Sequence, residues 1–271
     1  MFILMFENVC LLTKASTILK KQIREKYILN TLHKNGEISV NQIIENFNVT
    51  SMTARRDIAK LAEEGYLIRT HGGALRADPL ENMFSFSTRI DNNKNNKINI
   101  GRRAAKFVRD HESIYIDSGT TLIRMCQFLK DRKGINVITN SLPAASELTN
   151  YSNIKVTLLG GDIIHERRSI YGQIAVEQAE KYSVTKAFIG TDGISLKSGL
   201  TAYGNNESQV SNVMAGSASE VFLLCDSSKI EHDSTYKFAK LSSVDYLITD
   251  SGIDKKIVQK YKKEKINLIV V

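Results

Sequence analysis

Residues 47–74 read FNVTSMTARRDIAKLAEEGYLIRTHGGA, and this stretch decides the fold of the N-terminal part of the chain. Thr50 or Ser51 can cap the free N–H groups at the start of a helix, directly after the apolar Val49. Apolar residues then recur at spacings of three and four, at Ala54, Ile58, Leu61 and Ala62. The stretch therefore predicts an amphipathic helix with one face against a core and the other face free.

The free face and its front edge carry short side chains first and long cations after them: Thr50, Ser51, Met52, Thr53, Arg55, Arg56 and Lys60. This order suits the major groove of DNA, where the first residues of a recognition helix contact base edges and later cations reach phosphates or guanine. The alternative is a solvated face on which one arginine pairs with Asp57 or Glu63.

The sequence before this helix favours the DNA-reading interpretation. Residues 24–33 form a helix with an apolar face, which Asn35-Gly36 can end. Residues 37–40 are extended, and residues 41–47 predict a second short helix. Two short helices joined by a tight turn are thus expected.

A basic hairpin is expected after the helix. Gly65 ends the helix, residues 66–70 alternate in strand fashion, and His71-Gly72-Gly73-Ala74 supplies a turn that permits positive φ. Arg69 and His71 occupy positions from which a wing could enter the minor groove or touch phosphate. For His71 the alternative is a turn histidine that bonds its own backbone. We therefore predict a winged helix-turn-helix domain over residues 20–76.

This part of the chain resembles the DeoR family of bacterial transcriptional repressors. The family's V-S-x-x-T-I-R-R-D-L run is matched by residues 49–58, and its R-x-H-G-G-A wing by residues 69–74. Thr50 replaces a serine and still caps, and Ala54 replaces a larger aliphatic residue. The resemblance implies a DNA-binding regulator.

Composition agrees with a DNA-binding protein of two domains. The chain has 271 residues, which is too long for a winged domain alone, and a formal net charge of +8. Residues 1–76 carry 11 Lys and Arg against 7 Asp and Glu, so the positive charge is at least twice as dense there as in the remainder. A polyanionic partner is favoured.

Cysteine and histidine usage indicates neither a disulfide framework nor a metal site, and no cofactor is expected. The residues are dispersed and lack ligand spacing: Cys10, Cys126, Cys225, His33, His71, His111, His165 and His232. A reducing cytoplasm fits this pattern. The apolar run over residues 1–12 is interrupted by Glu7 and falls short of the ~20 residues that span a bilayer, so we expect no membrane anchor.

The remaining domain boundaries follow from composition. Residues 1–19 are treated as an N-terminal extension, and residues 77–96 as a linker that contains Pro79 and ends in an asparagine-rich run. Residues 97–271 form a second domain.

In the second domain, predicted helices alternate with short β-branched strands. Helices are expected at residues 98–109, 120–129, 142–148, 175–181, 210–218 and 254–262, and strands at residues 113–116, 137–139, 156–159, 187–189, 221–224, 246–249 and 268–271. This alternation predicts an α/β domain with a mostly parallel sheet covered on both faces, in which ligands collect at the carboxyl ends of the strands.

Polar and glycine residues stand at those ends. Asp117-Ser-Gly-Thr-Thr121 follows a strand and opens a predicted helix, so backbone N–H groups and hydroxyls could cradle an anion, although a capped helix start is the simpler alternative. Other strands lead into residues 139–141, 160–162, 190–193 and 226–229. Together these segments outline one site.

This half resembles the DeoR effector domain, whose fold is shared with ribose-5-phosphate isomerase and CoA transferases. The D-S-G-T-T, T-N-S, G-G, G-T-D-G-I, G-L-T and D-S-S-K motifs occur in the family's order. The resemblance implies a sugar-phosphate effector, with the phosphate held by Ser118, Gly119, Thr120, Thr121 and Lys229 and the sugar hydroxyls by Asp117, Asn140 and Asp192. For Lys229 the alternative is a surface lysine after a loop.

One departure affects the effector. Where the family shows Val-Lys-Arg after G-L-T and an acidic residue, this chain has Ser211 and Asn212, so a cation is missing. The alternative function is a sugar-phosphate isomerase fused to a DNA-binding module, with Asp117, Asp192 or Glu207 as base. The isomerase's K-G-G-G loop has no counterpart between Thr191 and Met214, which favours a regulator. We expect a homodimer or homotetramer that binds a palindromic operator and responds to the effector.

Overall fold

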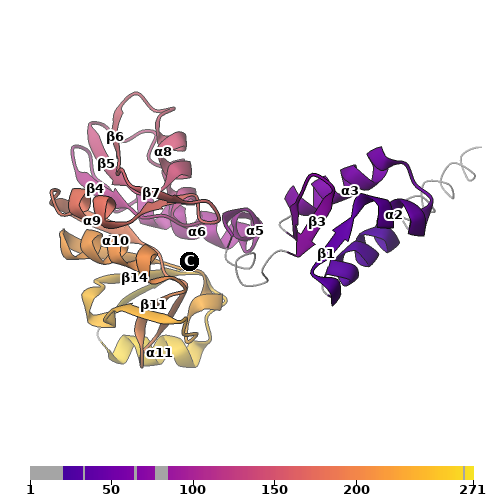
Figure 1. Cartoon of the computed structure of the whole chain (residues 1–271). Coiled ribbons are helices and arrows are strands. Elements are labelled where there is room, and N and C mark those ends of the chain that lie inside the picture. The colour runs from indigo at the N-terminus through magenta and orange to yellow at the C-terminus, as the bar shows by residue number, and fades with distance from the viewer. Residues whose placement is uncertain (1–20, 33, 64–65, 77–84, 265) are drawn as a thin grey trace, which may run out of the picture. The chain divides into compact units, whose positions relative to one another are not determined.

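The computed structural model describes residues 21–32, 34–63, 66–76, 85–264 and 266–271 (Figure 1). Its contacts divide the chain between Thr88 and Arg89 into two compact units, which we call the winged unit and the second unit. The predicted N-terminal extension, residues 1–19, lies outside the described residues.

The winged unit contains a helix over residues 21–32 and five further elements, β1 (Glu37–Ser39), α2 (Val40–Phe47), α3 (Ser51–Glu63), β2 (Leu67–Arg69) and β3 (Gly73–Arg76). Its three strands pair antiparallel in the order β1-β3-β2. The predicted two helices, recognition helix and hairpin are all present, and Thr50 caps α3 by accepting a hydrogen bond from the Thr53 N–H at 3.3 Å.

One apolar core holds these elements together. It is formed by residues from each of the three helices and each of the strands, including Ile28, Ile43, Ile58, Leu67 and Ala74. Strand β1 pairs antiparallel with β3, and Gly73 of β3 lies opposite Ser39. A Cβ at Gly73 would lie 2.0 Å from the Ile38 carbonyl oxygen. A side chain at Gly73 would therefore push β3 away from β1 and break their pairing.

The second unit is built on a seven-stranded sheet with the order β15-β14-β12-β9-β4-β5-β6, in which all neighbours pair parallel. Its strands are β4 (Ser113–Ile116), β5 (Ile135–Thr139), β6 (Ile154–Leu158), β9 (Val184–Ile189), β12 (Ala218–Leu224), β14 (Tyr246–Thr249) and β15 (Asn267–Val270). The predicted parallel α/β architecture is confirmed.

Helices cover both faces of the sheet, because side chains alternate along each strand. Ile114 and Ile116 belong to one core, with α6 (Lys94–Ala105), α7 (Ile123–Cys126) and α8 (Leu142–Leu148). Tyr115, between them, belongs to the other core, with α9 (Gln173–Ala179), α10 (Asn205–Gly216) and α11 (Lys255–Lys263). This alternation explains the continuously apolar strands.

Smaller elements lie beyond the carboxyl ends of the sheet strands. Five short strands that the sequence did not predict form a hairpin and a three-stranded sheet: β7 (Asp162–Ile164), β8 (Ser169–Tyr171), β10 (Gly193–Ser195), β11 (Gly199–Ala202) and β13 (Tyr236–Ala239). Each has three or four residues, too few for a period-two pattern to stand out.

Two sequence expectations need correction. The helix predicted over residues 120–129 is reduced to α7, because N–H groups such as those of Arg124 and Met125 donate three residues back, to Thr121 and Leu122. β-branched residues at its start disfavour a regular α-helix. The helix predicted over residues 98–109 begins earlier, because α6 starts at Lys94, and the linker predicted over residues 77–96 contains α5 (Phe86–Asp91); residues 77–84 lie outside the described part.

Candidate DNA-contacting surface and effector site

The recognition helix α3 is anchored by a buried ion pair. The Arg24 Nε donates to the Asp57 carboxylate, and both side chains are almost inaccessible to solvent. Asp57 is therefore engaged from the first helix, which removes one of the two acids that could have neutralised Arg55 or Arg56. The side chain of the other acid, Glu63, is outside the described part of the chain.

The free face of α3 presents the side chains expected there. Ser51, Arg55 and Arg56 are exposed, Thr53 is half-buried, and Met52 is 71% exposed. An exposed methionine at the front of such a helix can contact a thymine methyl group, while the arginines can reach guanine or phosphate. This surface combines polar, apolar and cationic contacts within two turns.

Two of the predicted contact residues also stabilise the winged unit itself. Thr50 caps α3. The Lys60 Nζ donates to the Glu25 carboxylate at 2.9 Å, which ties α3 to the first helix. The exposed residues Ser51, Met52, Arg55 and Arg56 therefore form the stronger part of the candidate surface.

The wing is a tight hairpin with exposed side chains at its tip. The Thr70 N–H donates to the Gly73 carbonyl oxygen at 3.0 Å and closes the turn. Arg69 and His71 are exposed, and Ile68 is 50% exposed. The wing thus presents a cation and an imidazole to solvent, as expected.

In the second unit, the predicted effector residues meet at one edge of the sheet. Asp117 follows β4, Asn140 follows β5, Asp192 follows β9, and Lys229 lies in a short 3₁₀ turn after β12. These four strands are neighbours in the sheet, so their carboxyl ends converge.

Asp117 is buried among hydrogen-bond donors. Its carboxylate accepts from the Ser118 N–H at 2.7 Å, the Ser211 hydroxyl at 2.7 Å and the Gly190 N–H at 3.3 Å. Burial raises the pKa of this carboxyl, and the hydrogen bonds, including one from Asn140, partly oppose that rise. Ser211, which stands where the family pattern has a cation, thus gives Asp117 a neutral partner.

The predicted phosphate cradle differs from expectation. The Ser118 N–H donates to the Asp117 carboxylate, and Thr120 and Thr121 are buried. The helix that should open here begins only at Ile123 and has four residues, so its dipole contributes little. The contribution of a helix dipole to anion binding at this edge is therefore small, and nearby cationic side chains become important.

Asp192 is clamped by two arginines. The Arg167 guanidinium donates to both carboxylate oxygens, at 3.0 and 2.9 Å, and Arg89 Nη1 lies 3.4 Å from one of them. The Tyr203 N–H donates to the same carboxylate at 3.0 Å. Burial alone would raise the pKa of Asp192, but the charges of Arg167, Arg89 and Lys229 hold it well below its usual range.

Two lysines lie close to this clamp, the buried Lys97 and the half-buried Lys229. Burial and the charge of Arg89 together lower the pKa of Lys229 to about 8, against the opposing effects of Asp192 and Asp226. Burial also lowers the pKa of Lys97 to about 8, despite the opposing charge of Asp226. The Lys229 Nζ donates to the Thr191 carbonyl oxygen at 2.5 Å.

We call Arg89, Lys97, Arg124 and Lys229 the cation cluster. The charges of Arg89, Arg124 and Lys229 all lower the pKa of Lys97, so these groups repel one another. Sequence reasoning found only Lys229. Arg89 and Lys97 fall in or beside the presumed linker, and nothing in the spacing of Arg124 or Arg167 marks either residue.

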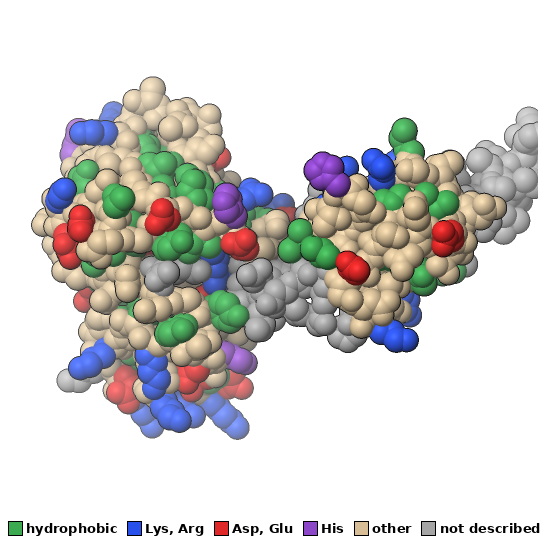
Figure 2. Space-filling model, in the orientation of Figure 1, with side chains coloured by type: hydrophobic (Ala, Val, Ile, Leu, Met, Phe, Trp, Pro, Cys, Tyr) green, Lys and Arg blue, Asp and Glu red, His purple; other side chains and the backbone are tan. Residues whose placement is uncertain are grey.

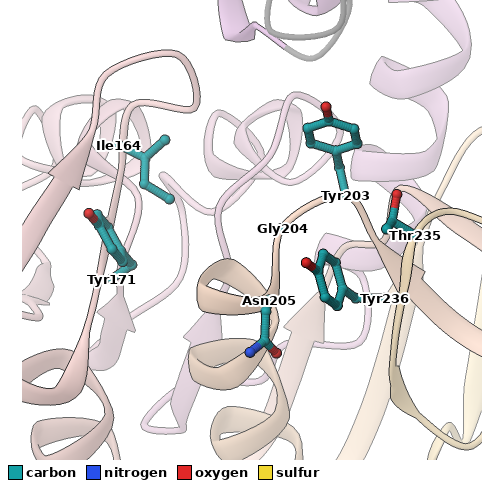
Figure 3. Close-up of a pocket in the computed structure, with 7 residues that line it drawn as sticks. All are labelled: Ile164, Tyr171, Tyr203, Gly204, Asn205, Thr235 and Tyr236. Atoms are coloured by element: carbon teal, nitrogen blue, oxygen red, sulfur yellow. The ribbon is translucent and has the colours of Figure 1, made fainter.

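A cavity of about 570 Å³ adjoins the clamp at Tyr203 (Figure 3). Ile164 and Tyr171 of the β7–β8 hairpin line one side, and Tyr203, Thr235 and Tyr236 line the other, with Asn205 at the start of α10 between them (Figure 3). Tyrosine rings and a carboxamide suit the apolar faces and hydroxyl groups of a sugar.

Other surfaces provide context. Lysine and arginine side chains gather around α11, which carries Lys255, Lys256, Lys260, Lys262 and Lys263 (Figure 2). Positive charge is thus not confined to the winged unit. Within the described ranges, no cluster of three or more metal-ligating side chains occurs, and no helix there is long and apolar enough to cross a bilayer.

Comparison with protein families gives two matches. The model described as the DeoR-like helix-turn-helix domain matches residues 24–79. The model described as the DeoR C terminal sensor domain matches residues 92–251. These ranges contain the candidate DNA-contacting surface and, apart from Arg89, the cation cluster.

Curated relatives cover most of the chain. The HTH-type transcriptional repressor GlcR of Bacillus subtilis is 36% identical over 82% of this chain and 86% of its own length. The lactose phosphotransferase system repressor of Lactococcus lactis is 33% identical over 90% of this chain and 97% of its own.

Among solved structures, ribose 5-phosphate isomerase A of Methanocaldococcus jannaschii is similar to 51% of this chain and 55% of its own, at 22% identity and a TM-score of 0.38. A likeness at that score supports no inference.

Proposed function

We propose, on the premise that the chain belongs to the DeoR family of transcriptional regulators, that it represses a sugar-catabolism operon under the control of a phosphorylated sugar. The family supplies the DNA-binding function. Similarity to a lactose phosphotransferase system repressor supports the sugar operon.

The positive charge of the cation cluster is the observation that supports a phosphorylated effector. The cation cluster holds four positive groups, of which Lys97 is buried and Arg89, Arg124 and Lys229 are half-buried, while the little-exposed carboxylates beside it are Asp192 and Asp226. Arg124 also lies 3.9 Å from the exposed Asp91. Asp192 is also shared with Arg167. The Arg124 Nε is buried and has no hydrogen-bond partner within the described part of the chain. Buried positive charge in excess is costly unless an anion offsets it.

We assign the phosphate chiefly to Lys97, Arg124 and Lys229, with the turn over residues 118–121 beside it. Asp117 and Asn140 are assigned to sugar hydroxyls. The Asn140 Oδ1 supports this role, because it is buried and accepts no hydrogen bond from the described residues. Asp192 positions Arg167 and Arg89 and can accept a hydroxyl as well.

On the DNA side, we assign base and phosphate contacts to Ser51, Met52, Arg55 and Arg56 in the major groove and to the wing residues Arg69 and His71. Two winged units from a homodimer or homotetramer would occupy half-sites about 34–36 Å apart, or a multiple of that, on a palindromic operator. Such an assembly works in the cytoplasm, where the operator lies.

We do not assign catalysis to the second unit. Its relatives are transcription regulators. Asp192 is neutralised by Arg167 and Arg89, and Asp117 is occupied by three hydrogen bonds. A general base must be free to reach the substrate carbon, and both carboxylates are engaged within the chain; the side chain of Glu207 lies outside the described part.

The test is a thermal-shift screen of the full chain against phosphorylated monosaccharides, each paired with its unphosphorylated sugar. A ligand that binds only the folded state raises the melting temperature. We expect at least one phosphorylated sugar to give a shift that its parent sugar does not. Lys229→Met should abolish the shift, whereas Lys106→Met, at an exposed lysine after α6, should retain it.

The same ligand should then change the affinity for duplexes selected by the protein from a random-sequence pool. If no phosphorylated sugar shifts the melting temperature, the effector class is wrong. If a ligand binds but operator affinity is unchanged, the second unit is not the sensor that controls DNA binding.

A further inference from the structure

Helix α5 stands in the sequence between the winged unit and the residues of the effector site, and its own Arg89 contacts that site. In the sequence, residues 77–85 stand between β3 and α5, and α5 is followed by α6 after Asn93, whose φ is 52°. The boundary between the two units falls inside α5, so a change in how its last residues, 89–91, are held in the second unit acts on the helix at that boundary.

The last turn of α5 is capped by the cation cluster. The Lys97 Nζ donates to the Arg89 carbonyl oxygen at 2.5 Å, and the Arg124 Nη2 donates to the Ile90 carbonyl oxygen at 3.0 Å. Carbonyl groups at the end of a helix lack partners within the helix, and cations near them are favourable. Two groups that we assign to the phosphate thus also fix the end of α5.

The side chain of Arg89 adds a third link. It reaches the Asp192 carboxylate, 3.4 Å away, and only 15% of it is exposed. Asp192 is the same group that Arg167 clamps from the loop between β7 and β8. In this way α5 is joined to the effector site by both backbone and side-chain contacts.

These links act against electrostatic repulsion. Arg89, Lys97, Arg124 and Lys229 carry like charges. Asp192 is a carboxylate that contacts Arg89, at 3.4 Å. An anion among the four cations would attract all of them at once. It would relieve their repulsion and hold the last turn of α5 more firmly.

We propose that α5 is the coupling element of this protein: an anion bound by Lys97, Arg124 and Lys229 draws Arg89 inward and tightens α5, and so changes the chain that leads to the winged unit. This coupling rests on the proposed function, since it takes the anion to be the phosphate of the effector. Arg89 acts in it as a positioning residue.

The test is hydrogen–deuterium exchange of the full chain with and without inorganic phosphate, at matched ionic strength. Inorganic phosphate is used because the cluster should bind it whichever sugar the effector carries. We expect amides of residues 86–91 to exchange at least threefold more slowly with phosphate, together with amides of residues 227–229. Arg89→Gln should retain the protection at residues 227–229 and lose it at α5, and Lys106→Gln should behave as the native chain.

Protection at residues 227–229 without any change at α5 would overturn the coupling, as would protection of α5 that persists in Arg89→Gln. A complete lack of response to phosphate would also overturn it, because an anion in the cluster is its premise. The sugar class fails separately: α5 would respond to phosphate while no phosphorylated sugar shifted the melting temperature.

Discussion

The two units present their candidate binding residues in opposite ways. In the winged unit these residues lie between Thr50 and His71, and most are exposed. In the second unit they come from segments between Arg89 and Lys229, and each is buried or half-buried. The first surface can therefore be altered with little cost in stability, whereas every charge in the second site also affects the fold.

The winged unit also contains one buried pair of charges, Arg24–Asp57, which departs from its otherwise exposed candidate surface. We expect the largest loss of stability there. Asp57→Ala leaves Arg24 buried without its partner and should destabilise the unit by about 3–5 kcal/mol. Denaturant unfolding should show this loss in a transition separate from that of the second unit. Lys60→Gln removes the more exposed pair with Glu25 and should cost below ~1 kcal/mol. If the two variants lost the same free energy of unfolding, the buried Arg24–Asp57 pair would not stabilise the winged unit more than the more exposed pair does.

Replacing a cation of the effector site should weaken ligand binding without lowering the stability of the second unit. Lys229→Met removes a half-buried charge that Arg89 and Lys97 repel, so the ligand-free second unit should become more stable or stay unchanged. Ligand binding should weaken by about 10- to 100-fold, since charge-assisted hydrogen bonds contribute about 1.5–3 kcal/mol. Calorimetric titration with the ligand found in the screen, beside thermal unfolding, measures both. A destabilised protein with unchanged ligand affinity would contradict our assignment.

The exposed surface should show the reverse behaviour. Arg55→Ala and Arg56→Ala should leave the melting temperature unchanged, and each should cost about 1–3 kcal/mol if it reads a base. A base-reading arginine relaxes one operator position, whereas a phosphate-contacting one weakens all sequences and lowers the salt slope by about one. Anisotropy titrations at several salt concentrations separate the two cases. Normal operator binding by both variants would show that α3 is not the recognition helix.

The smallest expected effect is on pH dependence. Lys97 and Lys229 have a pKa of about 8 in the folded protein and 10.5 as ordinary lysines. Loss of one proton should weaken anion binding about tenfold between pH 7 and 9. Between pH 8 and 10.5 the unfolded chain holds protons that the ligand-free folded chain has lost, so the stability of the second unit should rise with pH there.

Calorimetry and thermal unfolding at pH 7, 8 and 9 check both directions. The variant Lys229→Met should show a shallower dependence on pH. A ligand affinity that is constant across this range would mean that neither lysine holds the anion.

Sequence reasoning recovered the winged unit because its pattern is local. Cap, apolar stripe and glycine turn all fall within the residues that form the surface. It also predicted the sheet and the residues that directly follow its strands, such as Asp117 and Asp192. It could not find Arg89 or Arg167, because their roles depend on packing between distant segments. The overlong helix at residues 120–129 was wrong because local propensity does not reveal the tight turns there.

The strand order has a consequence for synthesis. Strand β9 lies between β4 and β12, so the sheet cannot close until residues 184–189 and then 218–224 have been made. The winged unit draws its core from residues 28–74 and can fold first. At ~5–20 residues per second, the ribosome needs about 5–20 seconds more to reach β9. A nascent chain can therefore carry a folded DNA-binding module that no effector can yet control.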